Sequence, residues 1–364
     1  MTTHHLRATL ALVAALTVGL SACALNEGPA NPGAGNGSGL AGTLNGKGAS
    51  SMKAAQKKWQ ADFQTAHPGV TVNYSPDGSG AGREGFIAGA VQYAGSDRPL
   101  KDAEMGAGGF VGCAPDSDAL NLPVYLSPIA VVFQVDGVSE LQLDADSVAG
   151  IFTGQIARWD DPRLVALNPG QPLPDAPITA VHRSDDSGTT ENFTDYLHVA
   201  APGVWTAEPS GQWPTAYVGE AAKGTSGVVD AVTIGRNTIG YADEAAAGDL
   251  GQARLRVGDE FLAPTPDAVA RIVDAAERRS DGRPALDLAL DLDRTAPGAY
   301  PAVLVSYLLV CEQYADPADA GLVKAFAGYV ASDAGQRSAQ ADAGNAPLSP
   351  AMAARVQAAV DSIQ

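Results

Sequence analysis

Two long apolar runs, and several short alternating ones, mark the strands of this chain. Residues 121–135 (NLPVYLSPIAVVFQV) and 302–311 (AVLVSYLLVC) are rich in β-branched and large apolar side chains, as in strands buried on both faces. Shorter strands are predicted at 70–75, 91–96, 178–182 and 238–241. Helical spacing of apolar residues predicts helices at 47–66, 83–90, 145–152, 191–197, 226–232, 265–279, 316–332 and 350–363. This alternation of strands and helices indicates an α/β fold.

The two long runs also predict how the chain divides into domains. With 364 residues the chain is too long for one ordinary core. We expect residues 45–124 and 304–364 to form a discontinuous domain I and residues 125–303 to form domain II, with the long runs as hinge strands between them. A ligand would then lie in the cleft between the domains.

The N-terminus has the pattern of an export signal followed by a tether. Residues 10–20 are apolar but too few to span a bilayer as a resident helix, so residues 1–22 are predicted to be a signal peptide. Residues 20–23 (LSAC) resemble the lipobox of bacterial lipoproteins, which implies that Cys23 is lipidated and begins the mature chain. The alternative is an ordinary secretory signal with an incidental Cys23. Residues 23–44 are rich in Gly, Pro and Asn and predict a flexible tether.

Composition limits the partners of this chain. Its 45% apolar and 18% charged residues fit a globular protein, and its formal net charge of −18 argues against nucleic acid and against an anionic membrane surface. We therefore expect the membrane to be reached only through the lipid anchor, at the outer face of the cytoplasmic membrane. The same charge means that any bound anion must be held by local groups against an unfavourable field.

Two cysteines remain after Cys23, namely Cys113 and Cys311. In an exported chain an even number of cysteines predicts a disulfide. Two buried free thiols are the alternative, and a thiol count on unfolded, unreduced protein separates the two.

Residues 178–197 (ITAVHRSDDSGTTENFTDYL) have the pattern of a strand, a tight loop and a helix, with Thr189 or Thr190 as the expected N-cap. Free amides at a helix start, together with the helix dipole, attract an anion. Ser187 and Thr189 add hydroxyl donors, and Arg183 adds a planar fork that suits a tetrahedral oxyanion. The alternative is a capped helix that carries a surface arginine.

Two further helix starts of the same kind, at residues 50–51 and 79–80, fall in the predicted domain I. Closure of the cleft would bring three sets of neutral donors around one anion. Asp97 follows a predicted strand nearby. A carboxylate in an anion site repels its ligand unless the ligand has a proton to donate, as phosphate has at neutral pH and sulfate has not. The alternative is a set of ordinary helix caps and a turn residue before Pro99.

Four segments together resemble a known family. They read GKGASSM (46–52), VNYSPDGSGAG (72–82), YAGSDRPL (93–100) and VHRSDDSGTTENFTDYL (181–197). They resemble the signature segments of the periplasmic phosphate-binding proteins of the high-affinity phosphate ABC importer, and residues 152–161 and 239–241 are also similar to that family. The resemblance implies a two-domain fold of the type II periplasmic-binding-protein class. It also implies a monomer that captures inorganic phosphate and delivers it to permease subunits driven by a cytoplasmic ATPase.

In domain I the resemblance implies phosphate contacts from four residues. Ser50 corresponds to a donor that uses its hydroxyl and its amide, Ser51 to a backbone N–H donor, and Ser79 to a hydroxyl donor. Asp97 corresponds to the carboxylate that accepts the ligand's proton.

In domain II the resemblance implies the positively charged part of the site. Arg183 corresponds to the guanidinium, which Asp185 is expected to orient. Ser187, Gly188 and Thr189 correspond to donors at the helix start.

Two positions depart from the pattern of the family. Ser51 stands where an aromatic residue is frequent, but only its N–H is needed there. Asp186 stands where Gly is usual and adds a negative charge near the anion, so we expect its side chain to face solvent.

Other functions are less well supported by the residues. Ser50 and Lys53 match the Ser-x-x-Lys of penicillin-recognising serine hydrolases, but residues 223–225 (KGT) have the wrong order for their Lys-Thr-Gly, and Ser-Asp-Asn is absent. The five histidines lack metal-ligand spacing, so neither a metal nor another cofactor is expected. A site for another tetrahedral oxyanion, such as sulfate or molybdate, remains an alternative, against which Asp97 and Arg183 argue.

Overall fold

One long mixed β-sheet runs through the residues that the structure, a computed structural model, describes: 39–106, 108–279 and 282–364. Their contacts place them in a single unit, Gly37–Gln364. The predicted signal peptide, Cys23 and most of the predicted tether lie outside the described residues. Within them, no helix combines the length and the apolar character that crossing a bilayer requires.

The order of strands in the long sheet is β2-β1-β3-β14-β4-β8-β6-β7, and β9 pairs with β4. These strands are β1 (Gly42–Gly48), β2 (Val70–Ser75), β3 (Tyr93–Ser96), β4 (Ala119–Gln134), β6 (Thr179–Arg183), β7 (Glu220–Ala222), β8 (Thr238–Asp243), β9 (Gly251–Gln252) and β14 (Val303–Cys311). Two small sheets are formed by β5 (Gln142–Leu143), β10 (Arg254–Val257) and β11 (Glu260–Leu262), and by β12 (Glu277–Arg278) and β13 (Leu290–Asp291).

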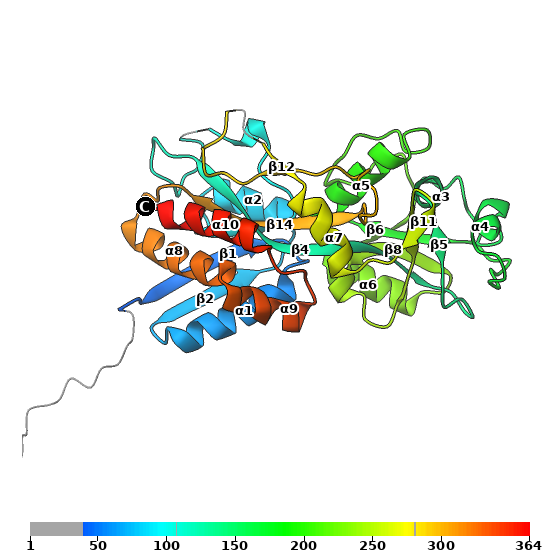
Figure 1. Ribbon diagram of the computed structural model, residues 1–364, viewed down its shortest axis with the longest axis horizontal. Coiled ribbons are helices and arrows are strands. Elements are labelled where there is room, and N and C mark those ends of the chain that lie inside the picture. Colours follow the sequence, from blue (N-terminus) through cyan, green and yellow to red (C-terminus); the bar gives the residue numbers. More distant parts are fainter. Residues whose placement is uncertain (1–38, 107, 280–281) are drawn as a thin grey trace, which may run out of the picture. The chain divides into compact units, whose positions relative to one another are not determined.

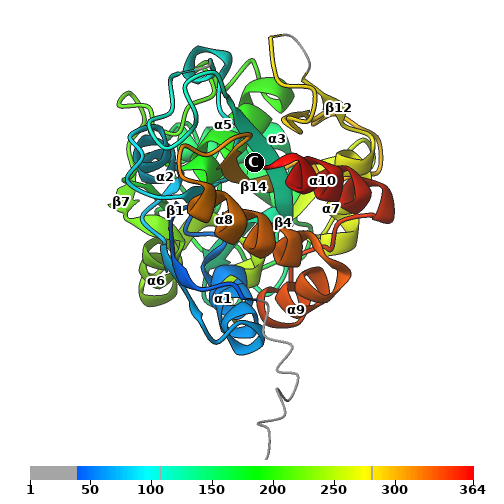
Figure 2. The same ribbon diagram turned by 90° about the vertical axis from the view of Figure 1, so that its left-hand side faces the viewer.

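Helices connect most of these strands. They are α1 (Lys53–Ala66), α2 (Ser79–Ile87), α3 (Ala145–Phe152), α4 (Pro162–Leu167), α5 (Gly188–Ala200), α6 (Gly224–Ile234), α7 (Pro266–Asp274), α8 (Pro317–Ala331), α9 (Asp333–Ala343) and α10 (Pro350–Ser362), with 3-10 turns η1 (Asp102–Glu104) and η2 (Glu244–Ala246). Figure 1 shows α1, α2 and α8 beside β1 and β2, and α5 and α6 beside β6 and β8. In Figure 2, α1, α8, α9 and α10 lie together on the side that faces the viewer.

Strand β4 divides the long sheet into two half-sheets. Up to Pro128 it pairs antiparallel with β14, and from Ile129 to Gln134 it pairs antiparallel with β8. We call β2, β1, β3, β14 and the first part of β4 the first half-sheet, and the last part of β4 with β8, β6 and β7 the second half-sheet. The two long apolar runs are thus confirmed as strands, and β4 crosses between the halves (Figure 1). The domain boundaries near residues 124 and 304 stay predictions.

Aromatic side chains fill the core on each side of this crossing. In the first half, the ring of Phe326 meets those of Phe63 and Tyr93, each with 5.4 Å between centroids. In the second half, Phe193 stacks on Tyr241 at 4.2 Å. A disulfide ties Cys113 to Cys311 at the end of β14.

The first strand was missed by the sequence prediction, which assigned residues 23–44 to a tether and residues 47–66 to a helix. Strand β1 begins at Gly42, and α1 begins only at Lys53. Leu44 is fully buried, but it is the strand's one large apolar side chain, so no alternation is visible. Gly46 is required there, because a Cβ on it would lie 2.1 Å from the ring of Tyr93.

Several other boundaries were predicted wrongly. Helix α2 begins at Ser79 instead of near residue 83, α5 begins at Gly188 instead of 191, and the helix predicted at 265–279 ends at Asp274. The β10–β11 hairpin, α4 and α9 were not predicted. Helix α9, for example, has a fully buried Ala339 but no large apolar stripe.

Candidate functional site

The predicted residues of the anion site lie at or just beyond the carboxyl ends of strands, and these ends meet at one place. Strand β1 pairs parallel with β2 and β3, and β6 pairs parallel with β7 and β8. The segments that follow β1, β2 and β3 in the first half-sheet, and β6 and β7 in the second, contact one another directly. The carboxyl edge of parallel strands is where α/β folds bind ligands.

Asp97 lies at the centre of these contacts and is 2% exposed. Its Oδ1 accepts hydrogen bonds from the hydroxyls of Ser51 at 2.6 Å and Ser306 at 2.8 Å, and its Oδ2 accepts one from Thr189 at 2.9 Å. Its amide donates to Oγ of Ser79 at 3.1 Å. The carboxylate is therefore held by two parts of the first half-sheet, the segment after β1 and strand β14, and by the start of α5.

Helix α5 begins in direct contact with Asp97. A Cβ on Gly188 would lie 2.7 Å from Cβ of Asp97 and 2.8 Å from Oγ of Ser79, so only glycine fits at this helix start. Ser187 is the N-cap, because its Oγ accepts from the amide of Thr190 at 3.2 Å. The prediction of Thr189 or Thr190 as N-cap was wrong. The first-turn amides of an α-helix lack intrahelical partners, so those of α5 point toward this region.

Arg183 ends strand β6 and is 2% exposed. Its Nε and Nη2 donate to the two carboxylate oxygens of Asp185 at 2.8 and 2.5 Å, and the amide of Gly224 donates to Asp185 at 3.0 Å. Burial pushes the pKa of Asp185 upward, but the hydrogen bonds and charge of Arg183, together with backbone donors such as Gly224, outweigh it and hold that pKa below its usual value. The expected pair is thus present, and two parallel charge-assisted hydrogen bonds to Asp185 fix the orientation of the guanidinium.

Ser50 contacts the second half-sheet. Its hydroxyl is hydrogen-bonded to the hydroxyl of Thr225 at 3.1 Å and accepts from the amide of Thr225, also at 3.1 Å. Neither Ser50 nor Ser51 caps α1, since the N-cap is Met52 and has no side-chain bond. The serine hydroxyls are directed to the site instead. Beside Ser50 lies a cavity of about 190 Å³, which Lys53 also lines.

Asp186 does not face solvent freely, contrary to the expectation from sequence. Its side chain is 37% exposed and accepts a hydrogen bond from Nη2 of Arg83 at 2.9 Å. Its backbone oxygen accepts from the amide of Gly80 at 3.1 Å. The charge that departs from the family pattern is therefore offset by a buried arginine of the first half-sheet, and the pair bridges the two halves.

Some residues around the site were not identified from sequence. Ser306 interrupts the apolar run of β14, and a lone buried serine in such a strand is a signal that could have found it. Asn192 donates to the backbone oxygen of Asp97 at 2.5 Å, and Thr225 and Arg83 bind as described above. No local pattern distinguishes these three from ordinary helix residues, because their partners are distant in sequence.

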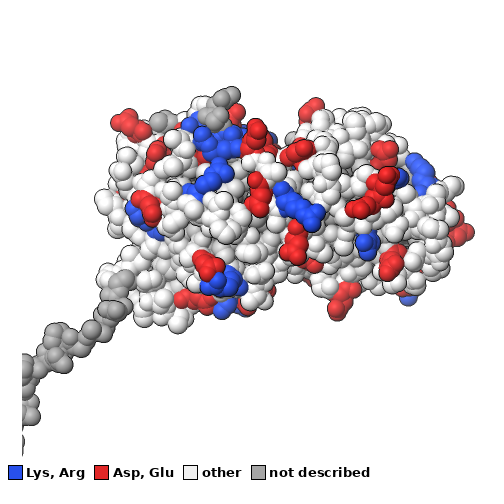
Figure 3. All heavy atoms as spheres, viewed as in Figure 1, with Lys and Arg blue, Asp and Glu red and all other residues white. Residues whose placement is uncertain are grey.

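The positive charge at the site is local and does not belong to a wider basic surface. On the face shown in Figure 3, basic side chains are scattered among acidic ones without forming a basic surface. Among the residues that the structure describes, no group of three or more His, Cys, Asp or Glu side chains could hold a metal ion. The arrangement offers one fixed guanidinium, several neutral donors and one carboxylate acceptor, which is chemistry suited to an oxyanion that carries a proton.

Comparisons with known proteins agree with this chemistry. A family model described as a PBP superfamily domain matches residues 33–334. The phosphate-binding protein PstS 3 of Mycobacterium leprae (strain TN) is 36% identical over 329 residues, which cover 88% of this chain and 87% of that protein.

Two solved structures show the same fold. A high affinity periplasmic phosphate-binding protein (PfluDING), bound with phosphate, superposes with a TM-score of 0.68 at 23% identity, over 87% of this chain and 93% of that one. A putative phosphate ABC transporter substrate-binding protein from Clostridium perfringens, with bound phosphate, gives a TM-score of 0.59 at 17% identity, over 83% and 98% of the two chains. The predicted α/β fold of the periplasmic-binding-protein class is confirmed.

Proposed function

Because this chain belongs to the PBP superfamily and, within it, to the family of the PstS phosphate-binding proteins, we propose that it captures inorganic phosphate for an ABC importer. The relatives are binding proteins by name, and the solved structures of the same fold hold phosphate. The site of this chain supports the same ligand on chemical grounds.

The proposed phosphate site joins donors from both half-sheets. Arg183 supplies the positive charge, and its fork is aligned by Asp185. The remaining donors are neutral groups, so they can replace the water around an oxyanion without adding charge. These donors are Ser50, Ser51, Ser79, Ser187, Gly188 and Thr189.

One observation carries the choice of phosphate, namely the way Asp97 is held. Three hydroxyls, those of Ser51, Ser306 and Thr189, occupy three of the roughly four lone-pair positions of its carboxylate. Oδ2 has a single partner, Thr189, and thus keeps room for one more donor. A ligand with an O–H can supply that donor, whereas sulfate would set lone pair against lone pair.

The direct contacts between the two half-sheets support closure around the ligand. Ser50 meets Thr225, Thr189 meets Asp97, and the amide of Gly80 meets the backbone of Asp186. We propose that a hinge motion of β4 and β14 opens these contacts to admit phosphate, and that closing them encloses it.

Binding without catalysis is the proposed activity. A penicillin-recognising hydrolase would need a serine activated by a nearby lysine. Here the hydroxyl of Ser50 is bonded to Thr225, and Lys53 is exposed on the adjoining surface. Nitrocefin should therefore remain uncleaved.

Export, lipid attachment at Cys23, anchoring at the outer face of the cytoplasmic membrane, the monomeric state and delivery to permease subunits complete the proposal. They follow from the N-terminal pattern and from the family, and a solved structure of the same fold is described as a putative phosphate ABC transporter substrate-binding protein.

Isothermal titration calorimetry tests the proposal. One phosphate should bind per chain, with sulfate and molybdate binding far more weakly under the same conditions. Heat from sulfate or molybdate without heat from phosphate would assign the site to another oxyanion, and no heat from any of the three would remove the proposal.

A further inference from the structure

A buried arginine outside the proposed phosphate site joins α5 to the start of β14. Arg294 precedes β14 in the chain and is 6% exposed. Its Nε contacts the carboxylate of Asp195, its Nη2 donates to Oδ1 of Asn192 at 2.5 Å, and its Nη1 donates to the backbone oxygens of Pro301 and Val303, both at 3.2 Å. The planar guanidinium thus bridges a helix of the second half-sheet and a strand of the first.

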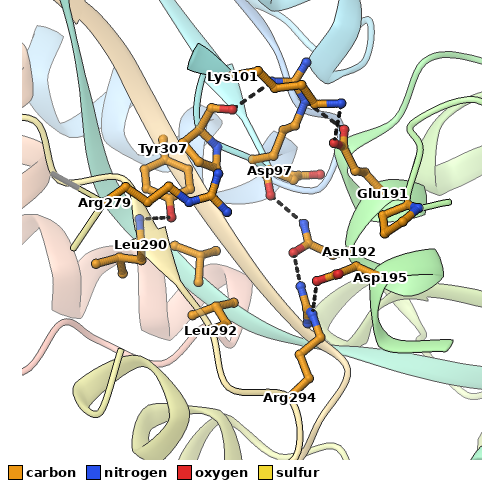
Figure 4. A pocket seen from close by; sticks show the side chains of 14 residues that line it. Asp97, Lys101, Glu191, Asn192, Asp195, Arg279, Leu290, Leu292, Arg294 and Tyr307 are labelled. Atoms are coloured by element: carbon orange, nitrogen blue, oxygen red, sulfur yellow. Dashed lines mark hydrogen bonds and ion pairs between the residues drawn. The ribbon is translucent and has the colours of Figure 1, made fainter. Parts of the chain in front are cut away.

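Asn192 extends this bridge to Asp97. Its Nδ2 donates to the backbone oxygen of Asp97 at 2.5 Å and to that of Gly188 at 2.9 Å, while its Oδ1 accepts from Arg294. The amide can serve in only one orientation, because a flipped amide would place its NH₂ against the guanidinium. Figure 4 shows Asp97, Asn192, Arg294 and Asp195 connected in this order. We call Asn192 and Arg294 the relay.

The relay connects three parts of the molecule that the proposed hinge motion would move. Asp97 follows β3 of the first half-sheet, Asn192 lies on α5 beside the second, and Arg294 is bonded to the start of β14. Ser306, also on β14, holds the carboxylate of the same Asp97. Strand β14 therefore contacts Asp97 by two routes. Ser306 binds the carboxylate of Asp97 directly, and the relay connects the start of β14 to the backbone oxygen of Asp97.

We propose that Asn192 and Arg294 are positioning residues that lock the closed form of the phosphate receptor without touching phosphate. The inference rests on the proposed function. Its basis is that Asp97 and α5 approach within hydrogen-bonding distance only when the halves are together. Opening would separate Asn192 from Asp97 but not from Arg294, so losing the relay destabilises the closed complex more than the open form.

This mechanism predicts a specific kinetic signature. Phosphate is released only after the closed form opens, so loss of bonds found only in the closed form raises the rate of release. The rate of capture by the open form stays the same. A variant that was merely less well folded would lower the number of binding sites, while the intact fraction kept both rate constants.

The surroundings of the relay allow a clean substitution. A cavity of about 170 Å³ adjoins Asn192 and Arg294 and is lined in part by Leu290, Leu292 and Val305 (Figure 4). Leucine has the same branching and the same number of side-chain heavy atoms as asparagine, and its bulkier methyl groups can extend toward this apolar wall, so Asn192→Leu removes the hydrogen bonds with little overpacking.

The test measures association and release of radiolabelled phosphate with the full chain and its variants. Asn192→Leu should raise the release rate by roughly tenfold or more, because a bond to a charged partner and a bond to Asp97 are both lost, and should change the association rate by less than about twofold. Arg294→Lys keeps a charge opposite Asp195 but loses the fork, so its release rate should rise by a smaller factor. If Asn192→Leu does not fold, Arg294→Lys decides the question alone.

Thr194→Val is the matched control. Thr194 lies on the same helix, is fully buried, and its hydroxyl bonds only to backbone groups of Glu191 and Ser210, which do not reach Asp97 or Arg294, so this variant should keep the wild-type rates. If Asn192→Leu or Arg294→Lys released phosphate at the rate of this control, the proposed role of the relay would be wrong, but the proposed phosphate binding would be unaffected. Absence of phosphate binding by the wild type would instead overturn the proposed function itself.

Discussion

Replacing Asp97 by Asn changes one acceptor atom in the proposed site to a donor. In the structure Oδ1 already accepts from Ser51 and Ser306, whereas Oδ2 accepts only from Thr189. The oxygen of the asparagine should therefore keep the position of Oδ1, and its NH₂ should take that of Oδ2. Thr189 can adapt, since its hydroxyl can accept instead of donate. The ligand then meets a donor where a lone pair had been.

The size of the effect follows from the bonds exchanged. Phosphate loses a charge-assisted hydrogen bond of about 1.5–3 kcal/mol, so its dissociation constant should rise by roughly 10- to 150-fold. In the wild type a sulfate oxygen would face the lone pairs of Oδ2 of Asp97, whereas in the variant it faces an NH₂ that can donate to it. Sulfate binding should therefore strengthen by about tenfold or more. The preference for phosphate over sulfate should then fall by a factor of roughly 100 or more.

Calorimetric titration of wild type and variant with each anion, at one pH and ionic strength, measures this preference. Asp274→Asn is the control, because Asp274 is exposed and its replacement makes the same change in net charge away from the site. A variant that loses phosphate affinity but excludes sulfate as strictly as the wild type would refute the argument from Asp97.

Three further predictions concern the rest of the molecule. Replacing Cys113 and Cys311 by Ala should lower the free energy of unfolding by up to about 5 kcal/mol, as the chain-entropy model gives for a separation of 198 residues, and equal urea midpoints would contradict this. Burial raises the pKa of Asp243 to about 7, so the stability that its protonated form contributes is complete below pH 4 and is lost as the pH rises through 7. Thermal melts of Asp243→Asn should depend less on pH between 5 and 8 than those of wild type, and parallel profiles would show that Asp243 is ionised throughout. Lys53 and Lys223 line the cavity beside the site and offer local positive charge on an acidic protein. Changing both to Gln should slow phosphate association severalfold at low salt but not at roughly 0.5 M salt, where charges are screened. A slowing that persisted at high salt would exclude electrostatic steering of phosphate by these lysines.

The parts of the site that sequence could predict are those encoded locally. Glycine, serine and threonine at a strand–helix junction specify a helix start whatever surrounds it, which is why the loops at Ser79 and Ser187 were found. It was harder to predict which partner each donor group of these loops binds. Ser51 was assigned an amide role, but in the structure its hydroxyl binds Asp97, and this depends on the distance between two segments 46 residues apart.

The parts that sequence could not predict depend on contacts across the fold. Arg83 and Asp186 are 103 residues apart, and Asn192 and Arg294 are 102 apart, so neither pair leaves a local pattern. Strand β1 was missed for a different reason. It is an interior strand with a single large apolar residue. Its Gly46 allows the close approach of Tyr93 and its Gly48 that of the backbone of Gly95, so its burial comes from its neighbours and not from its own composition.

The central claim is that this site accepts a proton from its ligand, and competition between two anions tests it most directly. Arsenate is tetrahedral and, like phosphate, carries a proton at neutral pH, whereas sulfate is tetrahedral and carries none. Displacement of radiolabelled phosphate from the wild-type protein should be efficient with arsenate and negligible with sulfate at the same concentration. Equal displacement by both anions would mean that the site selects only shape and charge, and the role given to Asp97 would be wrong.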